Sequence, residues 1–285
     1  MTDVAGKTIY ITGAASGMGL LAGKMLARLG AHIVTLDRNP SDAALHEIES
    51  ARRSPEQRVV RYRVNIAERE RVIGTVGRVV AEVGPPDILI NMAGIGGTSE
   101  LIDMKYETFD RVIQINLYGT RHIVEAVLPS MLRRGNCKIV LVGSMGGIIP
   151  VYGYTAYGSS KFAVVGLAQC LRYELKPRGI SVACFCPGEV ETPGLAAERN
   201  TLHPASAALK KIGGTMPVEA AVRGLVKGIE HDEAMIIPGW KVKVTYWIHR
   251  VTPDRLWNAI TDAIVAKALR ESKVVDSPKA VGGAL

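Results

Sequence analysis

The chain lacks the features that mark secreted, zinc-binding or membrane-spanning proteins. Its 285 residues include four cysteines and six histidines, neither of which shows the spacing of a zinc site or a disulfide framework. No run approaches about 18 uninterrupted apolar residues, and the first residues lack the basic and apolar segments of a secretory signal. We therefore expect a reduced, cytoplasmic protein that needs no metal. Its buried free thiols are expected to be Cys137, Cys170, Cys184 and Cys186.

The composition is that of a globular protein and excludes several other classes. Apolar residues make up 47% and charged residues 22% of the chain, so disordered, collagen-like and coiled-coil structures are not expected. The formal net charge of +8 favours acidic or phosphorylated ligands and anionic surfaces. The core of the chain carries no recognition motif and no basic run with interleaved aromatic residues. We therefore expect no binding to nucleic acid.

Short β-branched runs alternate with longer segments, most of which have helical period. Parallel strands need crossover connections, so this alternation predicts a doubly wound α/β fold of Rossmann type, with a seven-stranded parallel sheet and helices on both faces. Residues 1–238 are assigned to this domain, and the weakly periodic stretch 188–216 to a mobile flap. The expected strands are Thr8–Thr12, Ala31–Leu36, Arg58–Val64, Asp87–Asn91, Lys138–Val142, Ile180–Phe185 and Ala234–Ile237.

A glycine-rich turn follows the first expected strand and precedes a helix, in the segment Thr12–Gly19. Glycines let the backbone turn tightly and approach a pyrophosphate, and the helix N-terminus supplies N–H donors to the phosphates. Asp37 ends the second strand, where a carboxylate accepts ribose hydroxyls and repels a 2′-phosphate. Arg38 follows it and could hold that phosphate. The sequence therefore predicts a dinucleotide site that favours NAD over NADP.

A tyrosine and a lysine stand four residues apart in Tyr157-Gly158-Ser159-Ser160-Lys161. On a helix this spacing places both side chains on one face. A neighbouring ammonium favours the phenolate, which makes Tyr157 a candidate to exchange a proton with an alcohol or ketone. Ser144 follows a strand thirteen residues earlier, at the sheet edge where open α/β folds bind ligands.

Together these motifs resemble the short-chain dehydrogenase/reductase family, in its single-domain branch. The turn Thr12–Gly19 is similar to TGxxxGxG, Asn91–Gly94 stands for NNAG, and Pro187–Thr192 fits the PG motif. The resemblance covers residues 5–238. It implies an NAD(P)-dependent enzyme that interconverts a secondary alcohol and a ketone. It also implies the catalytic tetrad Asn116, Ser144, Tyr157 and Lys161.

The resemblance assigns a role to each of these positions. Tyr157 would exchange the proton, Lys161 would hold the nicotinamide ribose, and Ser144 would polarise the substrate oxygen, while Asn116 would fix a backbone kink. The implied cofactor-binding residues are Gly13, Ser16, Gly17, Met18, Gly19, Asp37, Arg38, Asn65, Ile66, Asn91, Ala93, Gly94, Tyr157, Lys161, Pro187, Gly188, Val190 and Thr192.

The sequence departs from the family pattern at two positions. Met92 replaces the second asparagine of NNAG, which removes one polar contact. Asn65 stands where the family often has an aspartate that contacts adenine, so weaker binding is expected there.

Family position also places a mostly apolar substrate pocket, which suggests a lipid, steroid or terpenoid-like alcohol or ketone. The alternative is a catalytically silent Rossmann protein that senses nucleotides or acts as a scaffold. A homodimer or homotetramer is expected from pairing of the helices near 105–133 and 153–176. The expected lining residues are Met145, Ile148, Val151, Tyr154, Leu195 and Met216, with Arg199 from the flap.

Residues 239–285 form a basic, aromatic-rich extension. Between 239 and 273 seven Lys and Arg residues stand against three Asp and Glu, and all three tryptophans of the chain lie there. Thr252 and Pro253 predict a helix start, with Thr at the N-cap and Pro at the first position. The preferred interpretation packs this helix over the substrate cleft or a sister subunit. The alternative is peripheral contact of 239–273 with an anionic membrane.

Overall fold

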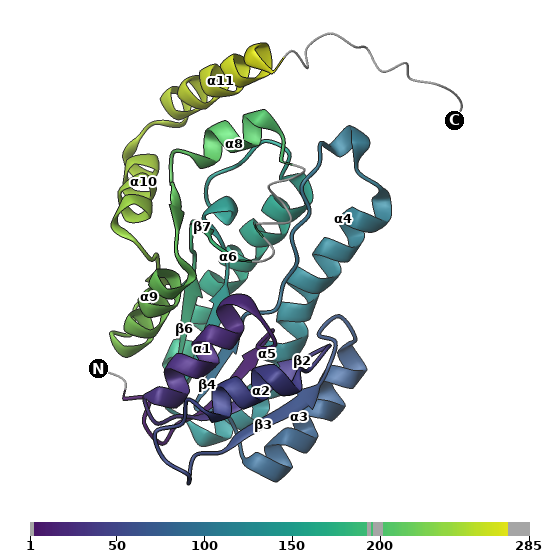
Figure 1. The fold of residues 1–285 in the computed structure, drawn as a ribbon, viewed down its shortest axis with the longest axis vertical. Coiled ribbons are helices and arrows are strands. Elements are labelled where there is room, and N and C mark those ends of the chain that lie inside the picture. The colour runs from purple at the N-terminus through teal and green to yellow at the C-terminus, as the bar shows by residue number, and fades with distance from the viewer. Residues whose placement is uncertain (1–2, 193–194, 196–201, 273–285) are drawn as a thin grey trace.

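The alternating apolar runs form one seven-stranded parallel sheet in the computed structural model, which describes residues 3–192, 195 and 202–272 (Figure 1). The strand order is β3-β2-β1-β4-β5-β6-β9, so the chain reverses its direction of winding between β1 and β4. This is the doubly wound Rossmann arrangement predicted from the sequence. The strands are β1 (Thr8–Thr12), β2 (His32–Asp37), β3 (Val59–Arg63), β4 (Ile88–Asn91), β5 (Cys137–Val142), β6 (Ile180–Phe185) and β9 (Met235–Ile236).

Helices cover both faces of the sheet, which is why the central strands are apolar along their whole length. On one face α1 packs against α2 and α9, and on the other α3 packs against α5. The segment α4, which leads into α5, packs against α6. The central strands β4 and β5 are buried at every position. The helices are α1 (Gly17–Arg28), α2 (Asp42–Glu49), α3 (Arg69–Val83), α4 (Tyr106–Ile113), α5 (Gly119–Arg134), α6 (Thr155–Leu175) and α9 (Val218–Glu230).

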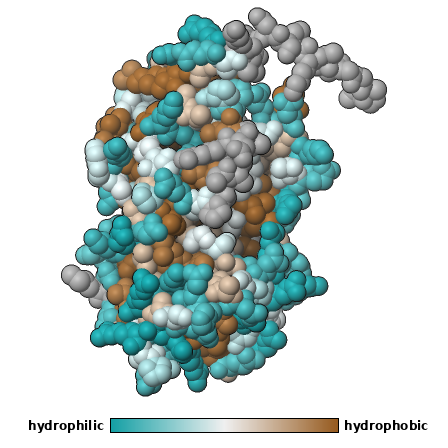
Figure 2. Space-filling model, viewed as in Figure 1, coloured by the Kyte–Doolittle hydropathy of each residue, from teal (hydrophilic) through white to brown (hydrophobic). Residues whose placement is uncertain are grey.

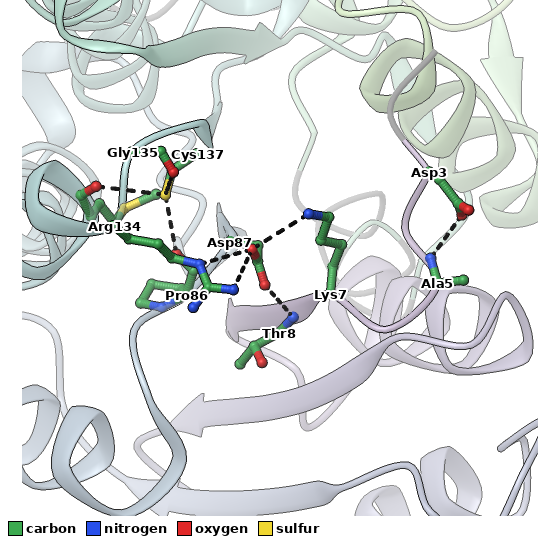
Figure 3. A network of polar contacts seen from close by, with 10 residues as sticks. Asp3, Ala5, Lys7, Thr8, Pro86, Asp87, Arg134, Gly135 and Cys137 are labelled. Carbon is green, nitrogen blue, oxygen red and sulfur yellow. Dashed lines mark hydrogen bonds and ion pairs between the residues drawn. The ribbon is translucent and has the colours of Figure 1, made fainter.

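At the amino-terminal ends of the strands, a buried carboxylate, Asp87, is surrounded by polar partners (Figure 3). It accepts hydrogen bonds from the backbone N–H of Thr8 at 2.8 Å and from Nε of Arg134 at 2.9 Å. The Nη2 atom of Arg134 lies 2.7 Å and the ammonium of Lys7 3.7 Å from the same carboxylate. Asp87 therefore ties the start of β1 to the end of α5.

The predicted strands are all present, with ends that differ by one residue at most. A second, two-stranded parallel sheet was not predicted; in it β7 (Glu189–Val190) pairs with β8 (Thr215–Met216). The predicted burial of Cys170 was wrong, because that residue is exposed on α6. Its position falls outside the helical face that Ala156, Ser160, Val164 and Ala168 turn toward the interior.

The chain continues past the sheet as two helices, α10 (Trp240–Val251) and α11 (Asp254–Glu271), and α11 packs against α8 (Pro204–Lys210). The predicted helix start was displaced by one residue. Thr252 is the C-cap of α10, where its hydroxyl donates to the carbonyl of Ile248 at 2.7 Å, and Pro253 takes the N-cap position of α11. The hydroxyl is therefore used by the preceding helix, which the sequence pattern did not predict.

Candidate active site

The glycine-rich turn has the geometry of an anion cradle at the N-terminus of α1. Gly13 and Gly17 have φ values of +68° and +55°, a region in which L side chains are strained. A Cβ on Gly19 would lie 2.1 Å from the carbonyl oxygen of Gly13, so only glycine fits there. Among the described residues nothing lies within 4 Å of a Cβ on Gly17. The first turn of α1 carries no acidic residue, so its N–H groups can receive a phosphate.

Asp37 lies at the carboxyl end of β2, beside this turn. Its carboxylate accepts from the backbone N–H of Ala15 at 3.2 Å and of Asn39 at 2.9 Å, which fixes the side chain against the cradle. Arg38 is exposed, and its carbonyl accepts from Nε of Arg63. A second cavity opens next to them, lined by Arg38, Asn39, Arg63, Val64, Asn65, Glu68, Arg71, Gly74, Thr75 and Arg78.

Two neighbouring residues of the implied cofactor site, Asn65 and Ile66, contact other parts of the protein. Asn65 donates through Nδ2 to Glu68 at 2.8 Å, and its Oδ1 accepts from the backbone N–H of Ala67 at 3.2 Å. Ile66 is buried and packs against Gly119, where a Cβ would lie 2.7 Å from its side chain. Asn65 therefore keeps an acceptor lone pair for a ligand, while Ile66 supports the start of α5.

A buried chain of hydrogen bonds connects the glycine turn to α5. The hydroxyl of Thr12 accepts from the N–H of Ala93 at 3.0 Å and donates to Oδ1 of Asn91 at 2.7 Å. Nδ2 of Asn91 donates to Thr120, which donates to the carbonyl of Asn116. Asn91 thus uses both of its side-chain polar atoms inside the protein, and it positions the turn that Ala93 and Gly94 form above β4.

Asn116 lies in a π-helical segment, Gln114–Tyr118, between α4 and α5. Asn116 is 1% exposed, and its side chain forms two hydrogen bonds with the backbone of Ile95. Its Oδ1 accepts from the N–H of Ile95 at 2.8 Å, and its Nδ2 donates to the carbonyl of Ile95 at 2.9 Å. Nδ2 also donates to the hydroxyl of Ser160 at 3.0 Å. The extra residue of the π turn releases a normal helical bond and lets the side chain reach across to α6. The family resemblance implied a backbone kink at this residue, and the structure places it in this π-helical segment.

Tyr157 and Lys161 lie one turn apart on α6, facing the carboxyl end of β5. The ammonium of Lys161 is 5.7 Å from the centre of the Tyr157 ring and donates to the carbonyl of Val142 at 2.8 Å. Burial lowers the pKa of Lys161 from 10.5 to about 8. A Cβ on Gly94 would lie 3.5 Å from the same ammonium and 3.1 Å from Oδ1 of Asn116, so this glycine keeps the approach to both groups open.

Ser144 stands opposite Tyr157 at the end of β5. Its hydroxyl accepts from the N–H of Gly146 at 3.0 Å and caps a short 3₁₀ turn, Met145–Gly147. A Cβ on Gly146 would lie 3.5 Å from Ser144 Oγ and 3.7 Å from the Tyr157 ring, so the two side chains lie against the same glycine. The structure thus brings Ser144, Tyr157 and Lys161 together, with Asn116 behind them.

These groups open into a cavity of about 360 Å³. Met145, Val151, Tyr154 and Leu195 line it as expected, together with Met18, Met92, Pro187, Gly188, Val190 and Thr192. The prediction that Ile148 and Met216 line the cavity was wrong. Ile149 lines it in place of Ile148. Met216 is turned inward, where a Cβ on Gly239 would lie 3.0 Å from its methyl group. Arg199 lies outside the described residues.

The extension closes the cavity over the PG motif. A Cβ on Gly188 would lie 3.0 Å from Val242 of α10, so the absence of a side chain at Gly188 lets that helix approach. Val242, Thr245, Trp257 and Thr261 all line the cavity. The preferred interpretation of the extension, a helix over the substrate cleft, therefore agrees with the structure.

Sequence reasoning missed a polar cluster at the wall of the cavity. The ammonium of Lys210 on α8 lies 2.7 Å from the carboxylate of Glu189 and donates to the hydroxyl of Tyr154 at 2.9 Å. Glu189 also accepts from Thr215, and the ring of Tyr154 meets that of Tyr157 edge-on at 5.8 Å. No motif links these residues, which come together only because α8 folds back over β7.

Comparison with known proteins decides the family to which this site belongs. The family model described as short chain dehydrogenase matches residues 7–203, well over half of the chain. The chain belongs to the short-chain dehydrogenase/reductase family. It is therefore an oxidoreductase that acts on CH–OH groups with NAD or NADP as acceptor, as the resemblance predicted. The glycine cradle, the open space at Gly17 and the buried Lys161 fit such a dinucleotide.

Several named oxidoreductases of this family resemble the chain. It is 33% identical to a bovine (Bos taurus) 3-ketodihydrosphingosine reductase over 199 residues, which are 69% of this chain and 60% of that protein. It is 36% identical to 3-oxoacyl-[acyl-carrier-protein] reductase FabG of Thermotoga maritima over 190 residues, 66% and 76% of the two chains. It is 32% identical to oxidoreductase UcpA of Salmonella typhimurium over 248 residues, 84% and 93% of the two chains.

Solved short-chain dehydrogenases share the fold. NAD+-bound xylitol dehydrogenase superposes with a TM-score of 0.72 at 28% identity, covering 83% of this chain and 97% of its own. A short chain dehydrogenase from Mycobacterium paratuberculosis bound to NAD gives the same TM-score and coverage at 26% identity. Within the described part of this short-chain dehydrogenase, no helix has the length and apolar content to cross a membrane.

Proposed function

We propose that the protein interconverts a secondary alcohol and a ketone on a hydrophobic substrate, with Tyr157 exchanging the proton. The observation that carries this proposal is that Ser144 and Tyr157 lie against the same glycine inside a mainly apolar cavity. Apolar walls favour a hydrophobic substrate, and the two hydroxyls provide the polar groups that orient its oxygen. Two relatives are named as reductases of a 3-keto and a 3-oxo compound, which supports the same chemistry.

Each member of the proposed tetrad has a task that its contacts support. Ser144 donates a hydrogen bond to the substrate oxygen, and Tyr157 gives a proton to that oxygen in reduction or takes it in oxidation. Lys161 keeps positive charge beside the phenol and is placed to hold the nicotinamide ribose. Asn116 holds Ile95 and Ser160 in place through its amide. A nicotinamide cofactor, when bound, supplies or accepts the hydride.

We propose NAD as the preferred cofactor, for which Asp37 is the main support. Its carboxylate is fixed next to the glycine turn, where it would repel a 2′-phosphate. The proposed cofactor contacts also include Ser16 and Met18 at the start of α1, Asn91 at the end of β4, Ala93 just after it, and the PG motif. Two relatives of known structure, named above, were solved with NAD bound, which supports the same cofactor here.

We propose a homodimer or homotetramer built through α4, α5 and α6. Large aromatic side chains on these helices remain exposed in the single chain, namely Tyr106, Phe162 and Tyr173. Exposed aromatic residues on paired helices are typical of an interface core. The division into residues 1–238 and 239–285, the mobility of the flap and the cytoplasmic location stay predictions.

The proposal is tested by measuring turnover of a panel of hydrophobic ketones with NADH and with NADPH. We expect reduction with a preference for NADH, and we expect Tyr157→Phe to lose activity by a factor of about 100 or more. Dinucleotide affinity of that variant, measured by calorimetry, should stay within about twofold. Binding of dinucleotide without turnover of any substrate would favour the silent sensor instead.

A further inference from the structure

The two C-terminal helices present apolar side chains to the outside of the molecule. On α10 these residues recur at positions i, i+4, i+7, i+8 and i+11, which is one face of a helix. Figure 2 shows hydrophobic surface gathered over the part of the molecule where Figure 1 places α10 and α11. We call this set the outer stripe; its members are Trp240, Val244, Trp247, Ile248 and Val251 on α10 and Leu256 and Ile260 on α11.

The outer stripe is not part of the core that folds these helices. The opposite faces of α10 and α11 already pack inward, with Val242 and Trp257 buried at the cavity and α11 seated on α8. By contrast, Trp240 is 72%, Trp247 61% and Val251 76% exposed. Large apolar side chains that gather in this way mark a surface that contacts another phase or partner.

Cations flank the outer stripe on both sides. At 100° per residue, Lys241 lies along one border of the stripe on α10, and Lys243 and Arg250 lie along the other. α10 contains no Asp or Glu, and none of these three cations forms an ion pair with a described residue. Lys241 and Arg250 instead lie over the rings of Trp240 and Tyr246, at 5.7 and 5.8 Å.

From this arrangement we propose that the outer stripe docks the protein on the surface of an anionic lipid bilayer. Apolar side chains at the centre of a helical face enter the acyl boundary, tryptophans occupy the interface, and the flanking cations pair with anionic headgroups. Each cation near such a surface contributes about 1 kcal/mol. A second copy of the chain fits less well, because twofold pairing would bring two sets of three cations together without any carboxylate from α10.

The docked orientation has a consequence for the substrate. The inner faces of the same helices line the cavity through Val242, Thr245, Trp257 and Thr261. Docking would therefore hold the cavity within about one helix diameter, roughly 10 Å, of the lipid. If the proposed function holds, the substrate class is a long-chain ketone or alcohol that partitions into membranes and reaches the cavity from the bilayer.

The test is flotation of the full chain with vesicles of phosphatidylcholine alone and of phosphatidylcholine mixed with phosphatidylserine. We expect the protein to float with the anionic vesicles, to stay behind with the neutral ones, and to be released by high salt. The double variants Trp247→Ser/Val251→Ser and Lys241→Glu/Lys243→Glu should each weaken binding about tenfold or more.

Two controls carry single substitutions of the same kind elsewhere on the surface. Ile102→Ser removes a side chain that is 84% exposed at a distance from the stripe in the sequence, and Lys227→Glu reverses an exposed charge on α9. Both should bind vesicles within about twofold of the wild type. Thermal unfolding followed by circular dichroism should show the same transition for every variant, since all of the changed side chains are exposed.

Several results would overturn the proposal. One is that the wild-type protein does not float with anionic vesicles. Another is that the stripe variants bind the vesicles as well as the wild type does. A third is a lipid-free dimer, detected by light scattering, that dissociates when Trp247→Ser/Val251→Ser is introduced. Reduction of a short, water-soluble ketone in a vesicle-free assay reports separately on the proposed function, so that its failure is not confused with failure to dock.

Discussion

Polar side chains lie at both ends of the parallel strands, the amino edge and the carboxyl edge of the sheet, but they are used differently. At the amino edge, the carboxylate of Asp87 is buried among Thr8, Arg134 and Lys7, which satisfy it within the protein. At the carboxyl edge, Ser144 and Tyr157 face a cavity instead. The strand order reverses between β1 and β4, and such a reversal leaves a crevice at the carboxyl ends of the strands. Polar groups at one edge therefore stabilise the fold, whereas those at the other are available for chemistry.

The comparison predicts its largest effect at the carboxyl edge, for Ser144→Ala. Removing a hydrogen-bond donor to the developing oxyanion should lower kcat about 100-fold or more. The free energy of unfolding should fall by about 1 kcal/mol or less, because among the described residues the side chain of Ser144 forms one hydrogen bond, from Gly146. Steady-state kinetics and urea unfolding measure the two effects. A large fall in the free energy of unfolding alongside the fall in kcat would contradict the distinction between the edges.

The complementary change at the amino edge is Asp87→Ala. We expect a loss of about 2–3 kcal/mol in the free energy of unfolding, a value reduced because Lys7 and Arg134 are themselves partly exposed. The kcat of the folded enzyme should stay within about twofold. Asp87→Asn, which can still accept from Thr8, serves as the milder control. A specific fall in kcat without loss of stability would show that this edge takes part in function.

A smaller effect concerns the pH dependence of stability through Lys161. Burial lowers its pKa to about 8 in the folded state against 10.5 when unfolded, so between these values the unfolded chain binds more protons. Stability should therefore rise with pH across this window. Relative to Lys161→Met, the wild type should gain about 1–3 kcal/mol from pH 7.5 to 10.5. Urea unfolding of both proteins without cofactor measures it, and a constant difference would contradict the assigned burial.

The smallest effect is expected at the wall of the cavity, for Lys210→Met. The ion pair with Glu189 and the bond to Tyr154 join α8 to β7 and to the start of α6. Their loss should raise KM about three- to tenfold while kcat changes less, since the proton-exchanging groups remain in place. Lys211→Met, one residue further along the chain, is the matched control. A fall in kcat at constant KM would give Lys210 a part in the chemistry instead.

Local signals in the sequence predicted the sheet and much of the candidate site. The strands were recognisable because runs such as those of β4 and β5 are apolar throughout, as buried parallel strands require. Ser144, Tyr157 and Lys161 were recognisable because each lies at a strand end or on one helix face. The backbone kink expected at Asn116 came from family resemblance alone, since nothing in its local pattern distinguishes it from the flanking helix; the π-helical segment found there was not predicted.

Other features could not be predicted because they depend on contacts between distant segments. The pair β7–β8 joins residues 189–190 to 215–216, and Lys210 reaches Tyr154 across 56 positions of the chain. The start of α11 was misplaced because Thr252 bonds back to Ile248, in a helix that its sequence of alternating basic and apolar residues did not indicate. Met216 was assigned to the cavity, yet it packs inward beneath Gly239.

The sequence by itself determined the order of strands and helices, the glycine turn and the spacing of Tyr157 and Lys161, because each follows from neighbouring residues. Only the tertiary structure decided which side of α10 and α11 faces the cavity and which remains exposed. On α10 the periodic apolar face, which includes Trp240, Val244 and Trp247, is the exposed one, so periodicity alone does not predict which face packs inward. Packing of Val242 on Gly188 and of α11 on α8 makes the choice.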